Sequence, residues 1–394
     1  MNIINRREEV IKLTQELVRA KSYSGEEKNA SKVLQEYFKD KGFDGVKVDK
    51  YGNTVGTIRG NRPGKSILFD GHLDTVPVTD ELSWTYPPFS AEIYDNKIHG
   101  RGTSDMKGAL AAMAVAAAYF VKEFNHDFPG VINVAGIVHE ECFEGVAARE
   151  VSKEYNPDYV IIGEASELNL KIGQRGRAEI KLEVFGKAAH SANPDKGINA
   201  VYKICKIIDE IKNLKPTEHP ILGKGILELT DLKSSPYPGA SVVPEYAVAT
   251  YDRRLLVGET KESVLKPLQD LLDKMMAEDI ELDAKVSYAF GEESCYTGNR
   301  IKGERFFPGW IFNENEDFIQ KIYKSIKDMG MDTKIAHYYF CTNASHYAGE
   351  AGIKTIGIGP SKENLAHTIN EYVEIEQLEK VCGIYFTIMK TLSK

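Results

Sequence analysis

The chain has 394 residues, of which 42% are hydrophobic and 27% are charged, a composition typical of a folded, water-soluble protein. This length exceeds what a single hydrophobic core usually organises, so we expect two domains. The formal net charge of -8 and the lack of a basic cluster argue against a nucleic-acid partner, because binding to a phosphate backbone depends on grouped lysine and arginine.

The sequence offers no pattern of export or membrane insertion. No run approaches the roughly 18 apolar residues of a membrane span, and no signal-peptide core follows Met1. The five cysteines are odd in number and scattered, without Cys-x-x-Cys spacing. We therefore expect a protein of the reducing cytoplasm, with no disulfide framework and no membrane partner.

Two amphipathic helices are predicted near the start of the chain. Val10, Leu13 and Leu17 have helical spacing, and a second such series ends at Gly42. Short strands are expected over residues 46–48 and 53–59.

A strand over residues 66–71 leads into the first pair of candidate site residues. His72 and Asp74 stand two apart at its end, so their side chains project to the same face. A metal-binding imidazole usually donates its second N–H to a carboxylate or carbonyl, and Asp74 is placed for that role. A lone His-x-Asp is weak evidence, and it gains weight only from further ligand-type residues at the ends of other strands.

A glycine-hinged loop over residues 100–105 carries Asp105. It superficially resembles a dinucleotide-binding loop, but Asp105 stands where the third glycine of that fingerprint would be, which argues against nucleotide binding. The alanine-rich helix expected over residues 109–120 can pack tightly against a sheet.

The run over residues 131–138 is short, apolar and not alternating, as in a buried parallel strand. It ends in His139, Glu140 and Glu141. Two adjacent acids there could be solvated loop charge, but ligands of open α/β sheets bind where strands end.

Other strand-like runs also deliver groups that bind metals. Residues 159–162 precede Glu164, and residues 355–359 lead towards His367. Five acidic or imidazole groups are thus expected to converge on one rim of the sheet as a metal site: His72, Asp105, Glu141, Glu164 and His367.

After Glu164 the pattern changes to alternating strands. Residues 174–294 predict the order strand, helix, strand, strand, helix, strand, which is ferredoxin-like. We interpret them as an α+β domain inserted into an α/β catalytic domain of residues 1–173 and 295–394, whose central sheet is mostly parallel.

Several further residues are candidates with open alternatives. His190 could be an ordinary exposed loop histidine, and Arg254 could form a surface ion pair with Asp252. Near the end of the chain, Asn343 could line the pocket, whereas His346 is more typical of a packed rim histidine.

Five motifs, in order, resemble one family. They are residues 71–77, 100–108, 139–141 and 163–164, and the late His367. The chain resembles the co-catalytic zinc amidohydrolases that include acetylornithine deacetylase, succinyl-diaminopimelate desuccinylase, aminoacylase-1 and carboxypeptidase G, and is most similar to the YgeY-like branch. The resemblance extends over nearly the whole chain.

The resemblance implies a role for each motif residue. His72 and Glu164 would hold one divalent ion, Glu141 and His367 a second, and Asp105 would bridge both. Zinc is the expected metal, with cobalt and manganese as alternatives. Asp74 would orient His72, and Glu140 would be the general acid/base.

The resemblance also implies a homodimer built through the inserted domain, which would serve as a lid. His190 would reach the active site of the partner subunit and stabilise the oxyanion, and Arg254 would bind a substrate carboxylate. The family usually has asparagine where this chain has Ser241, so a substrate-binding role of Ser241 is an open question.

These expectations favour a metal-dependent hydrolase that cleaves the amide bond of an N-acyl amino acid or short peptide. A catalytically silent, metal-stabilised dimer that binds a small carboxylate is the alternative, but such a protein needs no acid beside its metals such as Glu140. The lack of a Gly-x-Ser-x-Gly motif disfavours a serine hydrolase.

Overall fold

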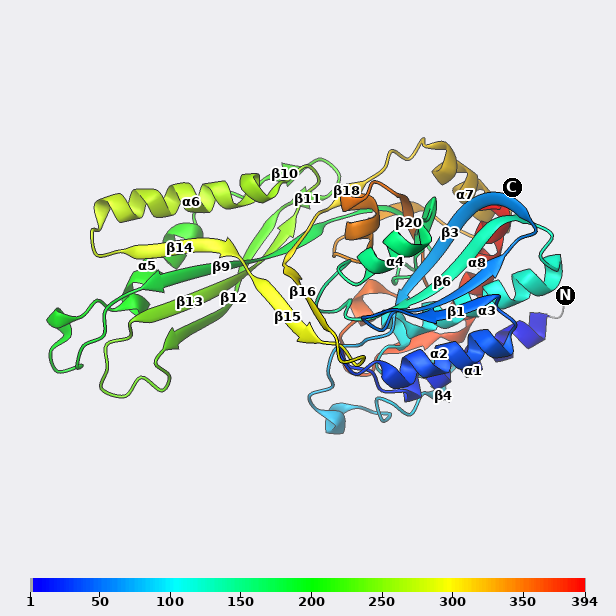
Figure 1. The fold of residues 1–394 in the computed structure, drawn as a ribbon, viewed down its shortest axis with the longest axis horizontal. Coiled ribbons are helices and arrows are strands. Elements are labelled where there is room, and N and C mark those ends of the chain that lie inside the picture. The colour runs from blue at the N-terminus through cyan, green and yellow to red at the C-terminus, as the bar shows by residue number, and fades with distance from the viewer. Residues whose placement is uncertain (1–2, 394) are drawn as a thin grey trace. The chain divides into compact units, whose positions relative to one another are not determined.

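The structure, a computed structural model, describes residues 3–393 and the side chains of residues 6–393. The chain divides into two compact units (Figure 1). Unit 1 comprises Met1–Gln174, Glu292–Lys302 and Ile311–Lys394, and unit 2 comprises Arg175–Gly291 and Gly303–Trp310. Unit 2 therefore takes up a second segment after residue 294, because β17 (Phe306–Phe307) pairs with β9 (Gly176–Phe185).

Unit 1 alternates strands and helices. Its helices are α1 (Ile3–Arg19), α2 (Lys28–Asp40), α3 (Gly108–Phe124), α4 (Ala148–Tyr155), α7 (Asp317–Lys327) and α8 (Ile375–Leu392). Its strands are β1 (Gly45–Val48), β2 (Thr54–Arg59), β3 (Arg62–His72), β4 (Glu92–Tyr94), β5 (Lys97–His99), β6 (Pro129–Ile137), β7 (Tyr159–Ile162), β8 (Leu170–Gln174), β19 (Ile335–Tyr338), β20 (Lys354–Gly357) and β21 (Tyr372–Glu374). Three short strands include residues of both units, β15 (Phe290–Ser294), β16 (Arg300–Glu304) and β18 (Trp310–Ile311).

The main sheet of unit 1 runs in the order β1-β2-β6-β3-β7-β20-β8, and β19 also pairs with β8. The four strands β6, β3, β7 and β20 are parallel. β2 and β8 pair antiparallel with β6 and β20, and β1 pairs antiparallel with β2. The predicted α/β fold with a mostly parallel central sheet is therefore confirmed. The antiparallel strands lie at the margins of this sheet. The carboxyl ends of the parallel strands lie along one edge, where crossover connections place ligand-binding loops.

Helices pack on the sheet through apolar side chains. Phe69 of β3 packs edge-on against Tyr385 of α8, and α3 packs against both α8 and α1. The alanine-rich α3 is buried from Gly108 to Val121, as expected of small side chains that allow close approach to a sheet. Among the described residues, no helix is long and apolar enough to cross a membrane.

Unit 2 contains α5 (Ala200–Ile211) and α6 (Lys261–Glu278) on one face of an antiparallel sheet. Its strands are β9, β10 (Glu218–His219), β11 (Gly223–Lys224), β12 (Ile226–Ser235), β13 (Tyr246–Leu255), β14 (Asp283–Tyr288) and β17. The sheet order β12-β13-β9-β14 is that of a ferredoxin-like fold.

Local sequence explains both helices of unit 2. The Asn199 side chain caps α5, and Thr260 and Ser263 form a capping box at the start of α6. Every second residue of β13 is buried, so one face of this strand packs under the helices while the other carries polar side chains.

Candidate metal centre

His72 is the last residue of β3 and is buried at the edge where the parallel strands end. Its Nε2 atom lies 2.8 Å from Oδ1 of Asp105 and 3.5 Å from Oε1 of Glu164. Asp105 comes from the kinked segment Thr103–Lys107 that leads into α3, in which its own backbone is not helical, and Glu164 follows β7. Three elements distant in sequence therefore supply one group of ligand-type atoms.

His367 lies on the other side of Asp105. Its Nε2 atom is 3.2 Å from Oδ2 of Asp105 and 2.9 Å from Oε2 of Glu141. The two oxygens of Asp105 thus face one histidine each. All five predicted ligands come together in unit 1, and Asp105 occupies the central position expected of a bridging carboxylate.

Charge is unbalanced in this cluster. Burial raises the pKa of both Glu141 and Glu164 to about 7, and the nearby Asp105 adds to each shift. Burial also raises the pKa of Glu140 well above its usual range, more than His72 lowers it. Buried carboxylates that lie this close together are stable only when a positive charge compensates them. A bound metal ion can provide that charge.

The histidines respond in the opposite sense. Hydrogen bonds to Asp105 and Glu141 raise the pKa of His367 to about 10. Burial alone would lower the pKa of His72, but Asp105 and Glu164 raise it well above its usual range. Burial would likewise raise the pKa of Asp105, yet the two histidines hold it far below. The imidazoles of His72 and His367 therefore favour their protonated, positively charged forms beside these carboxylates.

The donor set fits divalent metal ions. His72 with Glu140 and Glu164, and His72 with Asp105 and Glu141, form two groups whose ligand-type atoms lie within 4.8 Å of one another. Oε1 of Glu140 is also buried without a hydrogen-bond partner among the described residues. Mixed imidazole and carboxylate donors suit zinc, cobalt and manganese.

Asp74 contacts His72 through its backbone carbonyl. Nδ1 of His72 bonds to the main-chain oxygen of Asp74 at 2.8 Å, whereas the Asp74 carboxylate is 3.8 Å away. That carboxylate instead accepts the backbone N–H groups of Glu140 and Glu141, at 3.0 and 3.1 Å. Asp74 therefore holds the imidazole through its backbone and the two glutamates through its side chain.

A sharp turn follows β6 just before Glu140 and Glu141. His139 has φ of 56°, in the left-handed region, so the chain bends sharply where the strand ends. The backbone N–H of His139 donates to Oε1 of the buried Glu27 at 3.3 Å. Glu27 was not predicted as a site residue, since its partner lies 112 residues away.

Glu371 is a second residue that was not predicted from the sequence. It is fully buried and accepts bonds from the Arg101 side chain at 2.7 Å and from the backbone N–H groups of Gly102, Ser104 and Asp105. These bonds hold the loop that presents Asp105. The sequence signal for this role was weak. Glu371 is an acid four residues after the candidate ligand His367, and the glycine-rich loop offers backbone N–H groups.

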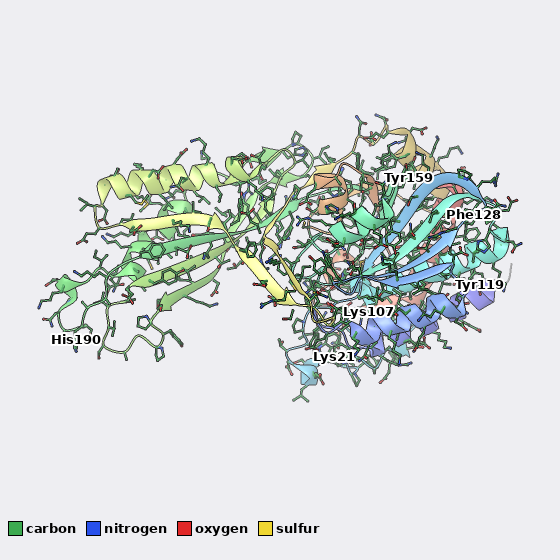
Figure 2. The ribbon with its side chains drawn as sticks, in the orientation of Figure 1. Lys21, Lys107, Tyr119, Phe128, Tyr159 and His190 are labelled. Carbon is green, nitrogen blue, oxygen red and sulfur yellow. The ribbon has the colours of Figure 1, made fainter. Side chains whose placement is uncertain are left out.

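Lys107 also ties this loop to its surroundings. It is fully buried in unit 1 (Figure 2), and its Nζ atom donates to the main-chain oxygens of Leu17 and Ala20, at 2.9 and 3.0 Å. These carbonyls lie at the end of α1, where the last carbonyls of a helix lack partners within it.

Asn343 is placed in a structural network. Its side-chain oxygen accepts the N–H of Gly145 at 2.8 Å, and its nitrogen donates to Asp70 at 3.1 Å. Because these bonds occupy both ends of a buried amide, the structure favours a supporting role for Asn343 over substrate binding. His346 pairs with Glu350 at 2.8 Å, in keeping with a packed rim histidine.

The other predicted substrate residues lie in unit 2. His190 is exposed in the loop after β9 (Figure 2), and an antiparallel bridge joins it to Val242, next to Ser241. Ser241 has φ of 49°, and its main-chain oxygen accepts the N–H of Ser191. The structure thus brings His190 and Ser241 into one loop cluster.

Arg254 lies on the polar face of β13 and is 31% exposed. Its Nε atom is 2.7 Å from Oδ1 of Asp252, so the alternative ion pair is present. Asp252 also accepts from Arg177 at 2.7 Å. One carboxylate is thus shared by two guanidinium groups, and Arg177 also lies 4.0 Å from Oε2 of Glu179.

Comparison with known proteins identifies the family. Residues 68–391 match the Peptidase family M20/M25/M40, and the chain belongs to this family. This confirms the resemblance seen in the motifs.

Particular relatives extend over nearly the full chain. The chain is 29% identical over 385 residues to the uncharacterized protein YgeY of Escherichia coli K12, covering 96% of this chain and 93% of YgeY. It is 27% identical to succinyl-diaminopimelate desuccinylase of Blochmanniella floridana, covering 98% and 99% of the two chains. Among solved structures, aminopeptidase PepT of Bacillus cereus matches with a TM-score of 0.73 at 21% identity, over 98% of this chain and 99% of that one.

A Bacillus subtilis protein, YxeP, matches with a TM-score of 0.71 at 12% identity, over 99% of each chain. It is described as a dinuclear metal-binding peptidase of this family. At these identities the two solved structures support the fold alone.

The Glu371 network generates the first prediction. Glu371→Gln keeps the side-chain shape but removes the charge that receives Arg101 and three backbone N–H groups, so the Asp105 loop should loosen. We expect metal affinity to fall roughly 10- to 100-fold, as is typical when a group that supports a ligand is lost. Competition with a chromophoric chelator would measure this.

Glu376→Gln is the matched control, because Glu376 forms only an exposed i,i+4 pair with Lys380. Equal metal affinity in both variants and in the original chain would show that Glu371 does not position Asp105.

Proposed function

We propose that this protein is a two-metal hydrolase that cleaves the amide bond of an N-acyl amino acid or a short peptide. Family membership supports metal-dependent amide hydrolysis. The observation that carries the proposal is the placement of Asp105 between His72 and His367, with Glu140 buried beside the ligand Glu141.

In the proposed site, His72 and Glu164 would hold one cation, Glu141 and His367 would hold the other, and Asp105 would contribute to both. Zinc suits these donors best, and cobalt or manganese could replace it. When bound, the two cations supply Lewis acidity to the attacking water and to the scissile carbonyl.

Glu140 is the proposed proton carrier. Asp74 fixes its backbone, and its carboxylate is buried with one oxygen that has no hydrogen-bond partner among the described residues. That oxygen would take a proton from the attacking water and deliver it to the leaving nitrogen, which departs as an amine. A group that shuttles a proton this way must lie beside the ligands without being one of them.

The second prediction separates Glu140 from its neighbour. Glu140→Gln should retain both metal ions but lose roughly 10²- to 10⁴-fold in kcat, because the amide cannot accept the proton. Metal content by atomic emission and turnover of N-acyl amino acids would be measured together.

Glu141→Gln is the matched variant and should lose metal as well as activity. A Glu140→Gln protein that is empty of metal would identify Glu140 as a ligand, and one that keeps full turnover would show that Glu140 does not carry the proton. An original chain that binds metal but turns over no substrate would favour the silent-binder alternative.

The substrate class rests on relatives and on Arg254. The relative named as a desuccinylase supports cleavage of a C–N bond. A protein of net charge -8 repels small anions at long range, so capture of a carboxylate requires a local cation. Arg254 would supply it by exchanging Asp252 for the substrate, and Ser241 could add a hydroxyl in place of the family asparagine.

The third prediction concerns this arginine. Arg254→Leu should lower kcat/KM roughly 30- to 1,000-fold for substrates with a free α-carboxylate, because a charge-assisted contact of about 2–4 kcal/mol is lost. The amidated analogue should change little.

Asp252→Asn is the matched control, since it weakens the ion pair but leaves the cation, and should keep the preference for carboxylates. If Arg254→Leu slows both substrates equally, Arg254 is structural.

We also propose that unit 2 forms a homodimer and that His190 serves the active site of the partner subunit. Its exposure supports a role outside its own chain, and an antiparallel sheet with free edges can pair with a copy of itself.

The fourth prediction uses subunit mixing. Glu140→Gln and His190→Ala should each be nearly inactive, but after exchange the mixed dimer contains one site with both residues. An equal mixture should recover to about a quarter of the original activity, given random pairing of two chains.

Mass spectrometry of differently tagged chains would monitor the exchange of subunits. If exchange occurs and activity does not recover, His190 acts within its own chain or not at all. A fully active monomer in sedimentation would exclude the dimer.

A further inference from the structure

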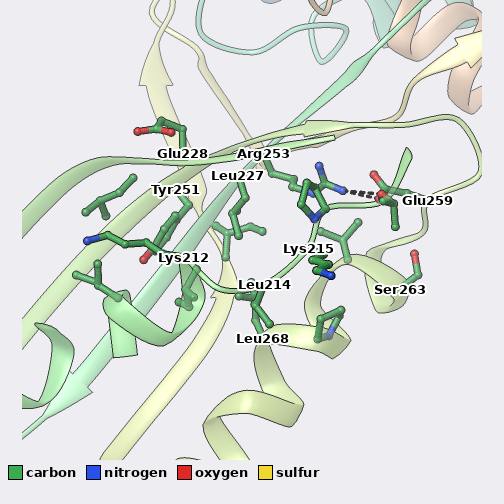
Figure 3. A pocket seen from close by; sticks show the side chains of 18 residues that line it. Lys212, Leu214, Lys215, Leu227, Glu228, Tyr251, Arg253, Glu259, Ser263 and Leu268 are labelled. Atoms are coloured by element: carbon green, nitrogen blue, oxygen red, sulfur yellow. Dashed lines mark hydrogen bonds and ion pairs between the residues drawn. The ribbon is translucent and has the colours of Figure 1, made fainter. Parts of the chain in front are cut away.

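Unit 2 contains a cavity of about 350 Å³ that the proposed function does not use (Figure 3). It lies between the end of α5, the segment that follows it, α6 and the buried face of β12 and β13. Its walls are mainly apolar, and they include Ile208, Leu214, Leu227, Leu229, Val264 and Leu268. This volume is at the lower end of the range for small-molecule sites.

Tyr251 supplies an unsatisfied polar group in this apolar wall. It lies on the buried face of β13, is 3% exposed, and its hydroxyl has no hydrogen-bond partner among the described residues. Burial raises the pKa of Tyr251 to about 12, so the hydroxyl is a neutral donor. Buried donors are nearly always satisfied in folded proteins, so an orphan that lines a cavity indicates a missing acceptor.

The charged side chains around the cavity favour an anion. Arg253, two residues along the same strand, is already paired with Glu259 at 2.5 Å. Lys212 and Lys215 come from the segment after α5 (Figure 3). Lys212 forms an exposed i,i+3 pair with Asp209 at 3.1 Å, and Lys215 has no ion pair within the part of the chain that the structure describes. The cavity lining itself carries three cations, Arg253, Lys212 and Lys215, and two carboxylates, Glu228 and Glu259.

We propose that this cavity binds a small organic anion, whose apolar body fills the space between α6 and β12 and whose carboxylate accepts the Tyr251 hydroxyl in the field of Lys212 and Lys215. A medium-chain carboxylate has the required shape, a single acceptor group on a flexible apolar body. All lining residues belong to unit 2 and none belongs to the metal cluster, so this inference goes beyond the proposed hydrolase and does not depend on it.

The test is calorimetric titration of the metal-loaded protein with octanoate. We expect one molecule bound per chain with a Kd of about 1 mM or tighter, which is reasonable for a ligand of this size. Octylammonium, which has the same chain and the opposite charge, should not bind.

Tyr251→Phe should weaken octanoate binding roughly 5- to 30-fold, because it removes only the hydroxyl donor. The matched control is Tyr246→Phe, on the same strand but the opposite face, where the hydroxyl donates to Glu183 at 2.7 Å. This control should bind octanoate as the original chain does.

Val264→Phe should abolish binding, since the larger ring fills the cavity. If Tyr251→Phe and Val264→Phe both bind octanoate unchanged, the anion binds elsewhere and the inference is wrong. It is equally wrong if octanoate fails to bind the original chain, or if octylammonium binds as well. None of these results bears on amide hydrolysis, which is measured separately in the same variants.

Discussion

The site depends on the position of Asp105 between two histidines. One oxygen lies 2.8 Å from His72 and the other lies 3.2 Å from His367. A buried carboxylate in this position is stable only when positive charge is available on both sides, because desolvation otherwise favours its neutral form. Protonated histidines meet this need in the protein alone, and two divalent ions would meet it in the loaded enzyme.

Much of the surrounding polar structure serves to hold this arrangement. Glu371 binds the backbone of the loop that carries Asp105, and Asp74 binds the backbone of Glu140 and Glu141. Both are buried carboxylates that accept N–H groups from irregular segments, which the strands cannot satisfy. These hydrogen bonds hold the loops at the strand ends that carry the candidate ligands, most of which lie outside the regular strands and long helices.

The sequence predicted the parts of the site that follow from local pattern. Residues 131–138 form a short, unbroken apolar run, and such a run predicts a buried strand whatever its neighbours are. The positions of His72, Glu141 and Glu164 after such runs therefore predicted that they meet at one edge of the sheet, whereas their assignment to two metal ions came from the resemblance to the family. The ferredoxin-like order of unit 2 followed from alternation and helical spacing in the same way.

The rest depends on contacts between distant segments. Glu371 and Glu27 bond to backbone groups more than 100 residues away, and backbone donors leave no mark in a sequence. The bonds from the backbone of Glu140 and Glu141 to the Asp74 carboxylate could not be predicted for the same reason, because their donors are also backbone groups. Phe306 and Phe307 belong to unit 2 because they pair with β9. A strand of two residues is too short to be recognised from the sequence.

Anomalous diffraction at the zinc edge, from crystals of the zinc-loaded protein, tests most directly whether Asp105 bridges two metal ions. We expect two peaks about 3.5–4 Å apart, as is typical of two-metal sites, with Asp105 between them, His72 and Glu164 on one, and Glu141 and His367 on the other. A single peak, or two peaks that do not share Asp105, would contradict the bridging role.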